Sequence, residues 1–179
     1  MSNKTYDRIR RMKTRKMLIL ALLMAINIAI SSFFIEVGPN LRLYFTFIVN
    51  MIVAANFSLP LVITYAIVED FIAFFLFPSG PFFVGYTLTA VAGCVIYYIF
   101  LHKEINLKNI IIAKTLVNVF VNIALNSLWS SMLYSKGYIY YLTKSVVKNL
   151  AMLPIEIMLF YTIYKLIKPL LNKYMSNMK

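Results

Sequence analysis

The chain has 179 residues, of which 61% are hydrophobic and only 13% are charged. Soluble domains carry about 25% charged residues, so this composition excludes a soluble globular protein and predicts an integral membrane protein. The net charge of +12 is concentrated, with seven Lys and Arg among the first 16 residues, which is typical of a cytoplasmic membrane-topology signal and not of a nucleic-acid-binding surface.

Six apolar stretches follow in chain order, each bounded by charge, Pro, Gly or a polar cluster. Their approximate ranges are 17–35, 43–57, 59–77, 82–101, 110–133 and 138–168. Most are close to the roughly 20 residues that cross the hydrocarbon core, and a helix satisfies its own backbone groups there. We therefore predict an all-α integral membrane protein with six transmembrane helices, built as one domain over 1–179 in which 1–16 form a basic cytoplasmic segment.

The loops between these stretches can be assigned to sides of the membrane. With the basic N-terminus in the cytoplasm, six crossings return the C-terminus to the same side, and the loop "HKEINLKN" also lies there. The loops "EVGPNLR", "PSGP" and "YSKG" then fall outside.

Polar residues inside the apolar stretches indicate an interior face, because a charge at mid-bilayer costs about 2.5 to 3.5 kcal/mol and usually faces a cavity or a partner. The fifth stretch carries such residues at four-residue intervals, namely Lys114, Asn118, Asn122 and Asn126. With a rise of about 1.5 Å per residue, Asp70, Asn126 and Lys144 each lie roughly 10 Å below the outer boundary. Two simpler interpretations stay open: the asparagines hydrogen-bond between helices, and Lys144 and Lys148 snorkel to the membrane surface.

The start of the fourth stretch follows the outer loop "FPSGP" and reads Phe82, Phe83, Gly85, Tyr86, Thr87. Gly85 permits a close approach to this helix, and the aromatic residues beside it are suited to line a pocket. A turn followed by an interfacial aromatic belt is the alternative.

The first stretch places Ala21, Ala25 and Ala29 at four-residue intervals, forming a smooth strip where another helix can approach closely. This strip is either an internal packing seam or a docking surface.

Catalysis is disfavoured. Cys94 and His102 are the only residues of their types. The chain therefore has too few of these residues for a disulfide framework, a Cys/His zinc site or a nucleophile pair. Glu69 and Asp70 point about 100° apart on a helix. No G-x-x-x-x-G-K-[ST] motif is present, so uphill transport must take its energy from a partner.

Four segments carry a family resemblance, in this order: "RKMLILALLMAINIA", "FPSGPFFVGYTLTA", "LNSLWSSMLYSKG" and "KSVVKNLAMLPIEI". Together they resemble the substrate-binding S components of energy-coupling factor (ECF) vitamin transporters, and the folate-specific FolT branch in particular. The resemblance implies a six-helix protein of the bacterial cytoplasmic membrane that binds a vitamin from outside. It implies as partners a transmembrane coupling protein, which docks on Ala21, Ala25 and Ala29, and two cytoplasmic ATPases. No enzymatic activity, cofactor or metal is expected.

The resemblance also implies that the outer loops and outer helix ends enclose a folate. Aromatic faces, amides and cations suit its pterin, benzoyl and glutamate groups. The candidate binding residues are Arg42, Pro78, Gly80, Phe82, Phe83, Gly85, Tyr86, Thr87, Asn122, Asn126, Trp129, Lys144 and Lys148. Val84, Tyr86 and Lys144 depart from the family pattern. A lysine at 144 cannot form the bidentate contact with a carboxylate that an arginine forms. An S component for another vitamin, a stand-alone facilitator and a small membrane enzyme are the rival interpretations.

Overall fold

A computed structural model of the chain describes residues 3–38, 41–78, 81–134 and 137–175, with side chains described at 13–33, 44–78, 81–134 and 137–171. Its elements are α1 (Asn3–Ser31), β1 (Phe34–Gly38), β2 (Leu41–Tyr44), α2 (Thr46–Asn56), α3 (Leu59–Leu76), α4 (Val84–Leu101), α5 (Leu107–Leu116), the π-helical segment η1 (Val117–Leu125), α6 (Asn126–Leu133) and α7 (Tyr138–Met175). Among the described residues, five helical spans are long and apolar enough to cross a membrane: Lys13–Ser31, Leu59–Leu76, Val84–Leu101, Leu107–Leu133 and Tyr138–Leu171. The predicted helical membrane protein is therefore confirmed at this level.

The second predicted crossing is a short core helix. With 11 residues, α2 is about 16 Å long, well below the roughly 30 Å of the hydrocarbon core. Met51, Val53 and Ala54 have no exposed surface, and α2 packs against α1, α3 and α4. A helix that is hydrophobic on all sides is stable when neighbours surround it. By length, five helices of the described chain can cross the membrane. Length does not establish the sixth predicted crossing.

The loop predicted at "EVGPNLR" contains a β-hairpin, so the all-α description is incomplete. Strands β1 and β2 pair antiparallel with Phe34 opposite Tyr44 and Glu36 opposite Arg42, and the register shifts between Glu36 and Gly38. Branched and aromatic residues in "FIEV" and "LRLY" favour strands, and they flank the turn-favouring sequence "GPN".

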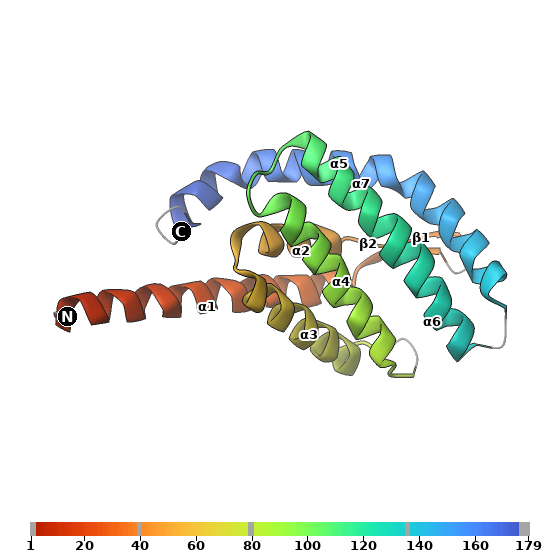
Figure 1. The fold of residues 1–179 in the computed structure, drawn as a ribbon, viewed down its shortest axis with the longest axis horizontal. Helices are drawn as coiled ribbons and strands as arrows, with labels where there is room; N and C mark the ends of the chain where they lie inside the picture. Colours follow the sequence, from red (N-terminus) through yellow and green to blue (C-terminus); the bar gives the residue numbers. More distant parts are fainter. Residues whose placement is uncertain (1–2, 39–40, 79–80, 135–136, 176–179) are drawn as a thin grey trace.

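The fifth predicted stretch forms one rod, α5–η1–α6, whose middle is π-helical. The side chain of Asn106 caps its start by accepting a hydrogen bond from the backbone N–H of Asn109 at 2.8 Å. Helix α7 has 38 residues with Pro154 and Pro169 inside it, and Figure 1 shows it arching over the other helices. Proline removes a helical hydrogen bond and causes such bends.

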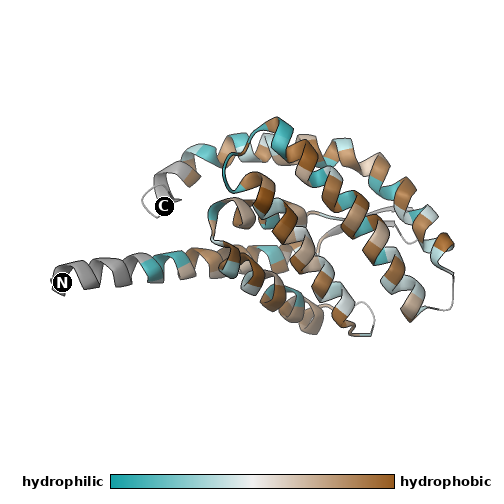
Figure 2. Ribbon diagram, in the orientation of Figure 1, coloured by the Kyte–Doolittle hydropathy of each residue, from teal (hydrophilic) through white to brown (hydrophobic). Residues whose placement is uncertain are grey.

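The helices are arranged so that α1 begins and α7 ends at one end of the molecule, while α3 ends and α4 begins at the opposite end (Figure 1). Apolar colour covers outward as well as inward helix faces in Figure 2. Phe75, Leu88 and Met158 are exposed by 75%, 56% and 71%. Exposed apolar surface of this extent is expected where lipid covers the protein.

Candidate ligand-binding site

Two adjoining hollows lie between the helices. The first, here called the polar chamber, has a volume of about 450 Å³, within the range of roughly 300 to 1,000 Å³ usual for small-molecule sites. Its walls come from α2, α4, the α5–η1–α6 rod and α7. Its charged and amide lining residues are Asn50, Lys114, Asn122, Asn126, Lys148, Asn149 and Glu156.

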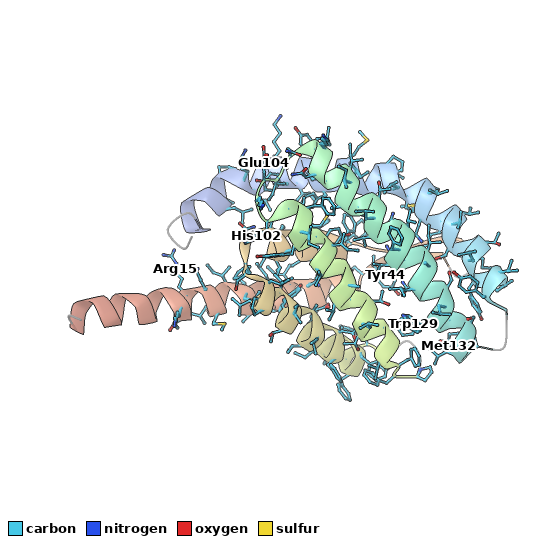
Figure 3. All side chains as sticks on the ribbon, in the orientation of Figure 1. Arg15, Tyr44, His102, Glu104, Trp129 and Met132 are labelled. Carbon is cyan, nitrogen blue, oxygen red and sulfur yellow. The ribbon has the colours of Figure 1, made fainter. Side chains whose placement is uncertain are left out.

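The second, here called the aromatic hollow, has a volume of about 530 Å³ and lies where α1 and α3 end and α4 begins. Its aromatic lining residues are Tyr44, Phe74, Phe77, Phe82, Phe83, Tyr86 and Tyr134. Tyr44 and Tyr86 line both hollows, so the two spaces adjoin. Figure 3 places Tyr44 and Trp129 toward the end of the bundle away from His102 and Glu104.

A buried ion pair closes one side of the polar chamber. Lys114 Nζ of α5 lies 3.2 Å from Glu156 Oε2 of α7, and the two side chains are 3% and 11% exposed. Asn118 Nδ2 donates to the same oxygen at 3.2 Å. The Lys114 ammonium also lies 4.1 Å from the centre of the Phe47 ring. The pairing reduces the cost of a lysine buried in a membrane helix.

The three asparagines predicted on the interior face of the fifth stretch differ in their surroundings: two line the polar chamber and one is buried behind it. Asn122 and Asn126 line the polar chamber, whereas Asn118 lies behind them, buried, and accepts a hydrogen bond from Asn122 Nδ2 at 2.9 Å. Ser145 donates to the backbone oxygen of Asn122 at 2.9 Å, which joins η1 to α7. Asn126 Oδ1 is buried and has no hydrogen-bond partner among the described residues. A buried oxygen without a partner costs about 1 to 3 kcal/mol, which a donor on a ligand would relieve.

Gly85 is covered by side chains. A Cβ at this position would lie 2.7 Å from Trp129 and still closer to the Phe83 ring. The Phe83 and Trp129 rings contact each other with centroids 5.6 Å apart, and Trp129 Nε1 donates to Thr89 Oγ1 at 2.9 Å. The close approach predicted at Gly85 is therefore made by these two rings, and Trp129 packs behind the linings of both hollows.

The remaining predicted residues of the α3–α4 connection lie in different surroundings. Pro78 and Phe82 line the aromatic hollow. Thr87 is buried and donates to Asp70 Oδ2 at 2.6 Å, tying α4 to α3, and it lies outside both linings. The hydroxyls of Tyr86 and Ser130 are 3.3 Å apart. Gly80 lies outside the described residues.

The three candidate cations are separated. Lys148 is partly buried and lines the polar chamber. Lys144 is exposed, with its Nζ 4.7 Å from the centre of the Tyr140 ring, and it lies outside both linings. Arg42 belongs to β2 opposite Glu36, but its side chain is outside the described side chains.

The alanine strip lies on an outward face of α1. Ala21, Ala25 and Ala29 are all exposed, while Leu20 and Asn27 on the same helix are 7% and 0% exposed. Within the described part of the chain, the strip is thus no internal packing seam.

Several chamber residues escaped the sequence analysis, including Asn50, Ser130 and Ser145. Asn50 carried a usable signal, because it is the lone polar residue in the middle of the apolar run "FIVNMIVAA", and such residues usually face a cavity or a partner. Small hydroxyl residues carry no comparable signal, since they bond to their own helix as readily as to a neighbour.

Comparison with known proteins identifies the family. No protein-family model matches the chain. The folate transporter FolT of Clostridium novyi is 28% identical over 156 residues, which cover 87% of this chain and 91% of that protein. The folate transporter FolT of Leuconostoc mesenteroides is 31% identical over 159 residues, covering 84% and 85% respectively. A crystal structure of FolT bound with folic acid superposes with a TM-score of 0.76 at 27% identity, covering 84% of this chain and 92% of that one. The chain therefore belongs to the FolT family of folate transporters.

Proposed function

We propose that this protein is the folate-binding S component of an ECF-type vitamin transporter. The observation that carries the proposal is the polar chamber beside the aromatic hollow, in a membrane protein whose family includes a member crystallised with folic acid. A transporter, not an enzyme, is the role for which the related proteins are named.

A folate in these hollows would meet groups suited to each of its parts. Phe82, Phe83 and Tyr86 offer aromatic faces to the flat rings. Asn126 Oδ1, which has no partner in the described part of the chain, offers an acceptor to a ring or amino N–H. Lys148 offers a cation to a glutamate carboxylate. Because Lys144 lies outside both linings, Lys148 is the better supported of the two lysines.

We further propose six crossings with both termini in the cytoplasm of a bacterium, α2 serving as a short crossing surrounded by protein. The basic residues that precede the first apolar stretch support a cytoplasmic N-terminus. The start of α1 and the end of α7 lie at one end of the molecule, which is consistent with an even number of crossings (Figure 1). In this topology the aromatic hollow, at the α3–α4 connection, opens to the outside.

The partners of the proposed function are a transmembrane coupling protein and two cytoplasmic ATPases. The sequence contains no P-loop, so ATP must be hydrolysed by other chains. Exposed alanines at 21, 25 and 29 support α1 as the docking helix, because small residues let helix backbones approach closely.

A vitamin panel tests the proposal. The purified chain in detergent is heated with folate, folinate, riboflavin, biotin or thiamine, and its unfolding temperature is measured. A ligand at 1,000 times its dissociation constant adds about 4.1 kcal/mol to the free energy of unfolding, so folates should raise the temperature and the other vitamins should not. Stabilisation by a different vitamin would instead indicate another S component. Transport of folate by the chain alone in vesicles would indicate a facilitator.

A further inference from the structure

The amide of Asn50 is held from behind by two buried residues. Asn50 lies in α2 and lines the polar chamber. Its Oδ1 accepts one hydrogen bond from Asn27 Nδ2 of α1 and another from the Tyr65 hydroxyl of α3, each at 3.0 Å. Asn27 and Tyr65 are 0% and 1% exposed. Among the described residues, no acceptor pairs with Asn50 Nδ2.

This hydrogen-bond pattern fixes which way the amide points. Of the side-chain atoms of Asn27, Asn50 and Tyr65, only Asn27 Oδ1 is buried without a partner among the described residues. Turning both amides over would place the Asn27 N–H groups where its Oδ1 now has no partner, and would leave these donors without acceptors. Buried N–H donors without any partner are rarer in proteins than carbonyl oxygens that lack one hydrogen bond, so the observed arrangement is favoured. The oxygen of Asn50 therefore faces the protein, and its NH₂ group faces the chamber.

We propose that Asn50 is a specificity-determining residue that presents only N–H donors to the ligand, and that Asn27 and Tyr65 are positioning residues that hold it in this orientation. The ligand places a hydrogen-bond acceptor, such as a carbonyl, carboxylate or ring nitrogen, against Asn50. The inference rests on the proposed function, in which folate occupies the polar chamber. Ligands with a donor at this point are disfavoured, because a site built around a hydrogen bond rejects molecules that leave its groups unpaired.

Two substitutions of Asn50 separate this role from a structural one. Asn50→Asp keeps an oxygen for Asn27 and Tyr65 but turns an oxygen toward the chamber, whereas Asn50→Leu removes both functions. Loss of one hydrogen bond should weaken folate binding about tenfold in Asn50→Leu. Adding an acceptor that opposes the ligand should weaken it by roughly 100-fold or more in Asn50→Asp. If Asn50 only held the helices together, Asn50→Asp would be the milder change, and that order would overturn the proposal.

A double-mutant cycle tests the positioning residues even if Asn50→Asp does not fold. Tyr65→Phe removes one hydroxyl and should weaken folate binding about fivefold in the chain that carries Asn50. The same change should have no effect on affinity in the Asn50→Leu background, because the hydroxyl acts only through Asn50. Equal losses in both backgrounds would overturn the positioning role.

The matched control is Asn56→Leu, in the same helix, whose Nδ2 donates to the Ile52 backbone oxygen at 2.8 Å and which lies outside the chamber lining. Its folate affinity should match that of the unmodified chain. All affinities come from one titration series in detergent, beginning with the unmodified chain. No folate binding by that chain would overturn the proposed function together with this inference, whereas binding that is insensitive to Asn50 and Tyr65 would overturn the inference alone.

Discussion

Lys148 lies in the wall of the polar chamber, whereas Lys144, one helical turn earlier in α7, lies exposed over the ring of Tyr140. The two lysines are on nearly the same face of the helix, since residues four apart are neighbours on a helix surface. They differ in their position along the helix axis, because Lys144 is about 6 Å nearer the start of α7. One lysine therefore borders the chamber and the other lies beyond it.

Replacing Lys148 by methionine should weaken folate binding without affecting pteroate, which has the same rings but no glutamate. A charge-assisted hydrogen bond to a carboxylate in a site that excludes water contributes roughly 1.5 to 3 kcal/mol. Its loss should lower the affinity for folate about 10- to 100-fold. Titration of both ligands against Lys148→Met measures this.

Lys144→Met is the matched control, and it should leave the affinities for both ligands unchanged because its ammonium lies outside the chamber. Equal weakening of folate and pteroate by Lys148→Met would mean that this lysine holds the rings or the fold. A selective loss of folate binding in Lys144→Met would place the glutamate tail beyond the chamber.

The helices themselves could be predicted because long apolar runs bounded by charge or Pro report membrane spans directly. Helix α3 begins at Leu59 and α7 at Tyr138, the residues at which the sequence analysis began those stretches. The burial of α2 could not be predicted, since it depends on which helices surround an apolar run. Nor could η1, because a shift from i→i+4 to i→i+5 hydrogen bonds leaves no periodic signature in nine residues.

The candidate site was only partly predictable, for a related reason. Residue type and depth selected Asn122, Asn126 and Lys148, and all three line the chamber. They could not tell that Trp129 would turn its N–H to Thr89, because this depends on how α4 and α6 are rotated against each other. Whether these residues bind a ligand stays a prediction.

Gly85→Ala should displace the two aromatic rings that cover this position. Its new Cβ would lie 2.7 Å from Trp129, a contact that must force a shift, and overpacking of this kind typically costs about 1 to 3 kcal/mol. We expect a lower unfolding temperature in detergent and weaker folate binding. Gly93→Ala is the control, because there the nearest atoms would be 3.9 Å away, an ordinary contact. Equal stability of the two variants would contradict this account of Gly85.

Ala25→Trp should abolish co-purification with the coupling protein and leave folate affinity nearly unchanged. Ala25 is exposed on α1, and an indole there would hold a docking helix away from the backbone. Met158→Trp, at an exposed position on α7, controls for the effect of a bulky ring on the lipid-facing surface and should assemble normally. Normal assembly of Ala25→Trp would show that docking occurs elsewhere.

The Lys114–Glu156 pair offers a test of what holds α5 against α7. Removing one partner leaves the other charge buried and unpaired, which costs roughly 3 to 5 kcal/mol. Lys114→Met and Glu156→Leu should therefore each lower the unfolding temperature in detergent sharply. The double variant replaces both charges by apolar groups of similar size, and such replacements are often neutral, so its unfolding temperature should return close to that of the unmodified chain.

Folate titration of the double variant adds a second readout: full affinity would mean that the pair only joins the helices. Persistent weakness in a stable double variant would mean that Lys114 or Glu156 also contacts the ligand. A double variant less stable than either single variant would contradict the view that the two charges act as one pair.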